Sequence, residues 1–298
     1  MNQLGVCIVT RFSKDVILDC LNSLFDQTPD LDLDIVVVDN ASQDGTVESI
    51  RLKFPTVKLI LNNENFGFSR AVNQGLKVLD SRYYVLLNPD SIVLPRALHS
   101  LVQFMEENPA VGICGPKVLN RDGSIQFQSR RGEARPWEVF SYFAGLARLF
   151  PKDHRFTGYL LNHIDNHAVN DVKAISGSCM LIRGEVVGQI GYLDEQYFAY
   201  QEDTDYCLQA RKAGWRVYYV PTAQVIHFGG RGGSGVNPYF GIYQWHRSYY
   251  LYYRKNLARD YPFWFHPFYY FVMFVKMVLN LAAVFFSRKK IVGTRKPS

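Results

Sequence analysis

The segment LGVCIVTRFSKDVILDCLNSLFDQTPDLDLDIVVVD, residues 4–39, contains two short β-branched runs on either side of an amphipathic stretch. The runs are Leu4 to Val9 and Ile35 to Val38, and each has the length and composition of a buried strand. Between them, from Lys14 to Phe25, apolar side chains recur at helical spacing. The segment therefore predicts a strand, a helix and a second strand.

The same alternation continues along the chain. Further helices are predicted at residues 46–53, 69–79, 95–108 and 204–213, and further strands at 57–61, 83–87, 112–119, 172–175, 179–182 and 216–220. This order favours an α/β fold with a doubly wound, mostly parallel sheet and helices on both faces. Residues 124–171 lose the periodicity, so we expect an irregular insertion there.

Charge is distributed unevenly over the 298 residues. The formal net charge is +6, but residues 229–298 carry eleven Lys or Arg against one acid, which leaves −4 for the rest. A negative main body argues against nucleic-acid binding, whereas a basic tail beside apolar residues suggests an anionic membrane surface.

The cysteines and the first residues bear on the compartment. Five scattered cysteines, an odd number without Cys-x-x-Cys spacing, predict neither a zinc site nor a disulfide framework and fit a reducing cytoplasm. The chain starts Met1-Asn2-Gln3-Leu4 without a basic region or a long apolar stretch, so we expect no export signal.

Polar residues follow three of the predicted strands. They are Asp39-Asn40-Ala41-Ser42, the stretch from Asn62 to Gly67, and Asn88-Pro89-Asp90. Ligands bind outside the carboxyl ends of parallel strands, so Asp39 and Asp90 are expected to converge on one crevice. Asp and Asn also favour simple turns, which is the alternative for each motif taken alone.

The cluster Glu202-Asp203-Thr204-Asp205 opens a predicted helix that ends at Gly214. One acid is enough to cap a helix, an effect worth roughly 0.5 to 2 kcal/mol, and three acids exceed that need. Crowded like charges raise a carboxyl pKa toward the range of a general base, while the helix N-terminus opposes that shift. The cluster is a candidate base, with capping as the alternative.

His227 ends an apolar run and precedes a glycine-rich loop at residues 229–235. A lone histidine more often has a structural role. The loop favours a ligand role instead, because its backbone amides can approach phosphate oxygens and a neutral imidazole can complete a metal's shell. The Gly-x-Gly-x-x-Gly match inside the loop is weak, since it runs into Pro238 without opening a helix.

Taken in order, these motifs resemble a known family. They are Asp39-Asn40-Ala41-Ser42, Asn65-Phe66-Gly67-Phe68, Leu87-Asn88-Pro89-Asp90, Ser176-Gly177-Ser178, Glu202-Asp203-Thr204-Asp205 and His227. The set is similar to the family 2 inverting glycosyltransferases of GT-A fold, and most similar to bacterial rhamnosyltransferase-like members. The resemblance covers about residues 4–255.

The resemblance implies a donor site. Its positions would be Thr10, Asp39, Asn65, Gly67, Arg70, Asn73, Asn88 and Gly177. Asp39 would contact the nucleotide base or ribose, and Arg70 and Asn73 would lie near the diphosphate. The chain departs from the family where Thr10 is followed by Arg11-Phe12-Ser13, and where the metal motif begins with Asn88 in place of Asp.

The resemblance also implies the chemistry. Asp90 would bind Mg²⁺ or Mn²⁺ with His227 as a further ligand, and Asp203 would be the catalytic base with Glu202 beside it orienting the acceptor. The metal would neutralise charge on the leaving nucleoside diphosphate while the base takes the proton from the attacking hydroxyl. In-line attack would invert the anomeric centre.

The implied function is transfer of a sugar, with rhamnose as one candidate, from a dTDP- or UDP-sugar to a glycan or polyprenyl-linked glycan during surface polysaccharide synthesis. Residues 1–235 would form the glycosyltransferase domain, with a nucleotide-binding half at 1–120 and an acceptor half at 121–235. Residues 236–298 would form a helical, aromatic and basic extension. A nucleotidyltransferase and a nucleotide-sugar-binding module without turnover are the alternatives.

The stretch from Pro267 to Phe286 is long enough to span a bilayer, at about 20 residues. Lys276 in its middle would cost roughly 2.5 to 3.5 kcal/mol on insertion, so we expect a helix lying in the interface, peripheral on the cytoplasmic face. The basic groups at 288–290 and 295–296 would strengthen this contact with anionic lipid. A helix packed on the enzyme or in a homodimer is the alternative.

Overall fold

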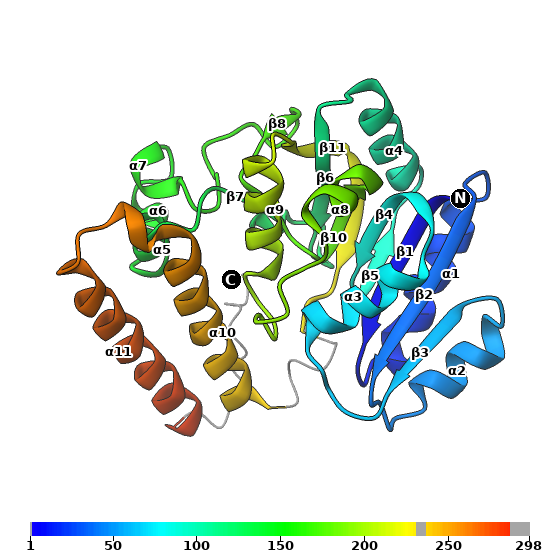
Figure 1. Ribbon diagram of the computed structural model, residues 1–298, viewed down its shortest axis with the longest axis horizontal. Helices are drawn as coiled ribbons and strands as arrows, with labels where there is room; N and C mark the ends of the chain where they lie inside the picture. Colours follow the sequence, from blue (N-terminus) through cyan, green and yellow to red (C-terminus); the bar gives the residue numbers. More distant parts are fainter. Residues whose placement is uncertain (1, 231–236, 287–298) are drawn as a thin grey trace.

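The computed structural model describes residues 2–230 and 237–286, and its centre is one mixed β-sheet (Figure 1). The strands of this sheet are β1 (Asn2–Thr10), β2 (Leu33–Asn40), β3 (Lys58–Asn62), β4 (Ser81–Leu87), β5 (Ser91–Val93), β6 (Val111–Leu119), β8 (Asn170–Asp171), β10 (Cys179–Arg183) and β11 (Arg216–His227). Two further strands, β7 (Arg130–Arg131) and β9 (Ala174–Ile175), pair with each other. Most of the predicted glycine-rich loop, and the basic groups after residue 287, lie outside the described residues.

The helices cover both faces of the sheet. They are α1 (Lys14–Gln27), α2 (Thr46–Lys53), α3 (Phe68–Val78), α4 (Ala97–Glu107), α5 (Pro136–Phe143), α6 (Leu146–Leu149), α7 (His154–Thr157), α8 (Gly184–Ile190), α9 (Glu202–Lys212), α10 (Pro238–Tyr252) and α11 (Phe265–Phe286). Side chains of α1, α2 and α4 pack in one hydrophobic cluster, and side chains of α3, α8 and α9 in another. The predicted α/β fold with helices on both faces is confirmed.

The sheet is parallel in its first half and mixed in its second. Its order is β3-β2-β1-β4-β10-β6-β11-β5, and β1 to β4 are parallel as predicted. β10 lies antiparallel between β4 and β6, and the short edge strand β5 runs antiparallel to β11. The hydrophobic pattern did not reveal these directions, because a buried strand has the same composition in either direction.

The strand predicted at 172–175 is divided in two. The N–H of Val172 donates to the carbonyl of Val217 at 2.9 Å, whereas the N–H of Lys173 donates to the carbonyl of Arg131 at 3.0 Å. The chain therefore changes partner here, pairing with β11 before this point and with β7 after it.

β11 extends beyond its predicted end at Val220. A register shift between Val220 and Gln224 carries the strand past Pro221, which cannot donate a ladder hydrogen bond. The continuation pairs His227 with Ser91 of β5. The bulge thus brings the histidine beside the strand that follows Asp90.

The insertion and the C-terminal helices share a third hydrophobic cluster. It joins Tyr159 of the insertion to Tyr249 of α10 and Tyr269 of α11, and the hydroxyls of Tyr159 and Tyr249 are hydrogen-bonded to each other. Figure 1 shows α10 and α11 side by side at the edge of the molecule farthest from β3. The expected boundary at 235/236 therefore separates segments that pack around one core.

Candidate active site

Thr10 and Asp39 lie opposite each other at the carboxyl ends of β1 and β2. Both side chains are buried, and Asp39 Oδ2 accepts a hydrogen bond from the Ser42 N–H at 2.8 Å. Asp39 Oδ1 and Thr10 Oγ1 are buried without a hydrogen-bond partner among the described residues. Buried polar atoms need partners, so this pair is suited to a polar ligand at the end of the sheet.

The loop before α3 is built around Gly67. The Gly67 N–H donates to Asn65 Oδ1 at 3.0 Å, and the next N–H, that of Phe68, donates to the carbonyl of Phe198 at 2.6 Å. Gly67 has φ +84°, and a Cβ here would lie 2.4 Å from that carbonyl oxygen. Only glycine fits this close approach. Arg70 is exposed on the first turn of α3, with its guanidinium 4.0 Å from the centre of the Phe66 ring.

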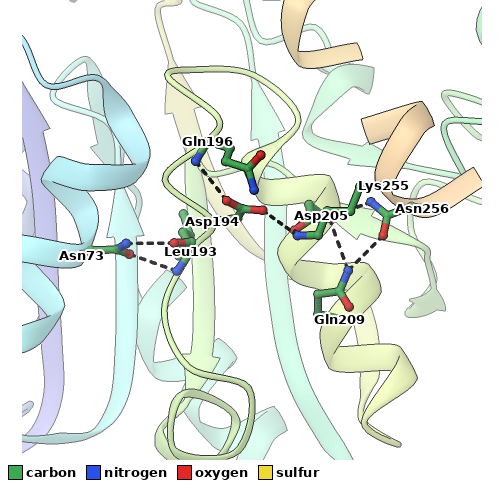
Figure 2. Close-up of polar contacts among 8 residues, drawn as sticks. All are labelled: Asn73, Leu193, Asp194, Gln196, Asp205, Gln209, Lys255 and Asn256. Atoms are coloured by element: carbon green, nitrogen blue, oxygen red, sulfur yellow. Dashed lines mark hydrogen bonds and ion pairs between the residues drawn. The ribbon is translucent and has the colours of Figure 1, made fainter. Parts of the chain in front are cut away.

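Asn73, on α3, is hydrogen-bonded to the loop at Leu193. Its amide Nδ2 donates to the carbonyl of Leu193 at 2.9 Å and to Glu195 Oε1 at 3.0 Å, while its Oδ1 accepts from the Leu193 N–H at 3.0 Å. Figure 2 shows Asn73 facing Leu193 from α3. Both ends of the amide hold a loop, and the place near the diphosphate that the resemblance implies for Asn73 stays a prediction.

Asp90 and His227 lie together, as the resemblance implied. His227 Nε2 is 3.2 Å from Asp90 Oδ1 and 3.0 Å from Asn88 Nδ2, and its Nδ1 is 2.7 Å from Gln126 Oε1. The Gln126 carbonyl can only accept, so Nδ1 carries the proton and the Nε2 lone pair accepts from the Asn88 amide, beside Asp90. This tautomer is the one that ligates a metal through Nε2.

The chemistry of the pair fits a hard divalent cation held partly by a substrate. Among residues 2–230 and 237–286, no group of three His, Cys, Asp or Glu is placed to hold a metal. Mg²⁺ is usually bound by one or two carboxylates together with substrate phosphates and water. One carboxylate and one imidazole at the end of the sheet meet that description.

Asp203, on the first turn of α9, is buried among donors. Its Oδ2 lies 2.6 Å from Arg131 Nη2 and accepts from the Gly177 N–H at 3.1 Å. Its Oδ1 accepts from the backbone N–H and the hydroxyl of Thr204. These contacts fix the orientation of the carboxylate, and the Arg131 charge compensates it inside the protein.

Glu202 is buried beside Asp203 in a less polar setting. The pKa of Glu202 is raised to about 8, mainly by burial and to a smaller extent by the charge of Asp203. Its Oε2 has no hydrogen-bond partner within the described ranges. The two neighbouring acids therefore differ, with Asp203 compensated by a cation and Glu202 holding a proton at neutral pH.

The loop 176–178 connects the two acidic motifs. The Asn88 N–H donates to the carbonyl of Ser178 at 3.0 Å, and the N–H of Gly177 donates to Asp203. On the other side, Asn40 Nδ2 donates to the carbonyl of Gly67 at 3.1 Å. The predicted motifs thus meet at one end of the sheet as two hydrogen-bonded groups. One joins Asn40 to Gly67, and the other joins Asn88 and Asp203 to the loop 176–178.

Two residues that contact the predicted site come from the insertion at residues 124–171, where the hydrophobic periodicity is lost and no site residue was predicted. Gln126 orients His227 and Arg131 pairs with Asp203. Neither lies in a helix or strand that the sequence predicts, and their partners lie 101 and 72 residues away along the chain. Only the three-dimensional fold brings them to the site.

Comparison with known proteins identifies the family of the chain. The model for glycosyl transferase family 2 matches residues 5–161. The chain is 29% identical to an N-acetylglucosaminyl-diphospho-decaprenol L-rhamnosyltransferase of Mycobacterium tuberculosis over 230 residues, which is 73% of each chain. It is 25% identical to rhamnosyltransferase WbbL of Escherichia coli over 161 residues, covering 53% of this chain and 56% of that protein.

Solved structures share the architecture. GalNAc-T7, crystallised with UDP, GalNAc and Mn²⁺, superposes with a TM-score of 0.56 at 16% identity, over 76% of this chain and 43% of that one. Residues 1–349 of S. aureus TarS give a TM-score of 0.52 at 19% identity, over 76% and 60%. The fold is GT-A, and the chain is a glycosyltransferase that belongs to glycosyl transferase family 2.

Proposed function

We propose that this glycosyltransferase moves a sugar, with rhamnose as the first candidate, from a dTDP- or UDP-sugar to a hydroxyl of a polyprenyl-linked glycan, with inversion at the anomeric carbon. The observation that carries the proposal is the loop 176–178, which bonds to Asn88 on one side and to Asp203 on the other. Donor and acceptor chemistry would then meet at this loop. The mycobacterial relative, named as an L-rhamnosyltransferase that acts on a decaprenol-linked sugar, supports the choice of sugar and of a lipid-linked acceptor.

The donor would bind at the carboxyl ends of the parallel strands. Thr10 Oγ1 and Asp39 Oδ1, which have no partner in the described part of the chain, suit the polar edge of a nucleoside. Asp90 and His227 would hold Mg²⁺ or Mn²⁺, which supplies positive charge to the departing nucleoside diphosphate. Arg70, exposed at the start of α3, is a candidate for a phosphate contact.

Asp203 would accept the proton of the attacking hydroxyl. Its carboxylate is held by Arg131, Gly177 and Thr204, so it is oriented before the acceptor arrives. Glu202, protonated at neutral pH, can donate a hydrogen bond to an acceptor oxygen. The two acids would therefore act as base and orienting group, respectively.

We further propose that α11 lies on the cytoplasmic surface of the membrane. Among the described residues it is the one helix long and apolar enough to cross a bilayer, with 11% of its apolar window buried. Lys276 supports an interfacial position, because its Nζ lies 3.8 Å from the Trp245 ring centre and 4.2 Å from that of Phe143. Its charge thus faces the protein and leaves Phe271 and Phe274 on an apolar outer surface.

The direct test is a panel of nucleotide-sugars incubated with the protein and Mn²⁺, with release of nucleoside diphosphate as the signal. The proposal expects one dTDP- or UDP-sugar to be consumed faster when a lipid-linked or short-chain glycan acceptor is added. NMR of the product should show the opposite anomeric configuration to that of the donor. Retention of configuration would contradict the inverting mechanism, and consumption without any transfer product would contradict the acceptor class.

A further inference from the structure

Lys255, in the turn that follows α10, bridges two carboxylates. Its Nζ lies 2.7 Å from Asp194 Oδ2 and 2.8 Å from Asp205 Oδ2 (Figure 2). Asn256 Nδ2 donates to the other oxygen of Asp205 at 2.7 Å, and Gln209 Nε2 donates to Asn256 Oδ1 at 3.1 Å. The Asp205 side chain is buried, so these groups are what compensates its charge inside the protein.

Asp205 and Asp194 stand on either side of the proposed catalytic acids. Asp205 lies on the first turn of α9, two residues after Asp203, and Asp194 lies in the loop 191–201 that leads into that helix. One cation from the C-terminal segment therefore holds both the helix and the loop before it. The span between these two anchors contains Glu202 and Asp203.

The C-terminal segment makes further contacts with the same loop. From α10, Arg247 Nη1 donates to the carbonyl of Gln196 at 2.7 Å, and Ser248 Oγ donates to the carbonyl of Ala199 at 2.7 Å. The opposite side of the loop is held by the donor half through Asn73. The loop is thus fixed between the donor half of the domain and the C-terminal segment.

The end of this loop has an unfavourable backbone conformation. Tyr200 and Gln201 have φ of +68° and +64°, so two consecutive residues with Cβ atoms lie in the left-handed region immediately before Glu202. Such conformations persist only where surrounding contacts impose them, and they are concentrated at functional sites. The contacts from the C-terminal segment are of this kind.

We infer that Lys255 is a positioning residue for sugar transfer, which holds the loop 191–201 and the start of α9 so that Glu202 and Asp203 keep their places. The inference rests on the proposed function of Asp203 as the base. It makes the segment after residue 236 a part of the catalytic unit in addition to its proposed contact with the membrane.

The test compares Lys255→Met and Lys255→Arg in the full chain, with Arg254→Met as the matched control. Arg254 is exposed and adjacent, and its replacement removes the same charge. With a short-chain soluble acceptor, Lys255→Met is expected to lower kcat about tenfold to a hundredfold, because a small misplacement of reacting groups has effects of that size. The KM for the nucleotide-sugar should stay at its wild-type value, and Lys255→Arg should recover most of the rate.

Hydrogen exchange provides a second measurement that does not depend on turnover. Amides of residues 192–205 should exchange faster in Lys255→Met than in the wild type and the Arg254→Met control. The inference is overturned if kcat and exchange both match the wild type, even when the thermal midpoint falls. If the wild type transfers no sugar, the proposed function fails, and the exchange comparison alone still decides whether Lys255 positions the loop.

Discussion

Replacing Glu202 by Gln changes how the stability of the protein depends on pH. Burial and the Asp203 charge raise the pKa of Glu202 from its ordinary value of 4.5 to about 8. Between these two values the folded protein keeps a proton that the unfolded chain has released, so wild-type stability falls as pH rises from about 4.5 to about 8. A Gln side chain resembles the neutral acid and has no proton to lose.

The magnitude follows from the size of the pKa change. A single group contributes a slope of about 1.4 kcal/mol per pH unit, so the full window corresponds to at most about 5 kcal/mol. Relative to the wild type, Glu202→Gln should therefore gain stability progressively from pH 5 to pH 8. The gain should level off above pH 8, because Glu202 is then ionised in both states.

Urea unfolding at several pH values measures this difference directly. Glu48→Gln is the control, since Glu48 is an exposed glutamate on α2. The two variants share the loss of one carboxyl group, and only the Glu202 variant should show a stability difference that changes with pH. A constant difference between the Glu202→Gln variant and the wild type over this range would refute the assignment of a buried, protonated Glu202.

Three other substitutions test the loop before α3, the orientation of His227 and the membrane contact of α11. Gly67→Ala should lower the free energy of unfolding more than Gly123→Ala. Both glycines have φ above +80°, which costs any other residue about 1 to 2 kcal/mol, but only at position 67 does the added Cβ meet a carbonyl oxygen. Equal losses of unfolding free energy in the two variants would contradict this. Gln126→Leu should weaken Mn²⁺ binding about tenfold to a hundredfold in a calorimetric titration with donor present, and unchanged affinity would exclude Gln126 as the orienting group. Phe271→Ser should weaken flotation with anionic vesicles about tenfold or more, whereas Leu52→Ser on α2 should not. Equal binding of both would argue against an interfacial α11.

The sequence was sufficient to predict the parallel half of the sheet. Strands at residues 4–87 alternate with amphipathic helices of ordinary length, and such units have few alternative arrangements. Asp39 and Asp90 could be placed because strand ends in a parallel sheet share one edge. The sequence indicated the cluster at Glu202 as a candidate site because it has more acids than a helix cap needs.

The remaining parts depend on contacts between distant segments. The antiparallel direction of β10 leaves no mark on its hydrophobic pattern, and Arg131 reaches Asp203 only because β7 pairs with β9. The bonds from Asn73 to the loop at Leu193 could not be read from the sequence, because the two residues lie 120 positions apart. The bridge from Lys255 to Asp205 joins residues 50 positions apart, and it gives the C-terminal segment a contact beside the candidate site that no sequence pattern indicated.

The catalytic base is tested most directly by Asp203→Asn. Nucleotide-sugar affinity is measured by calorimetry, sugar transfer by product formation, and folding by the thermal midpoint, with Asp122→Asn in an exposed turn as the control. The affinity should remain at the wild-type value while the transfer rate falls by roughly a hundredfold to ten-thousandfold, the usual contribution of a general base. A folded Asp203→Asn variant that transfers sugar at the wild-type rate would contradict the assignment of Asp203 as the base, and with it the proposed mechanism.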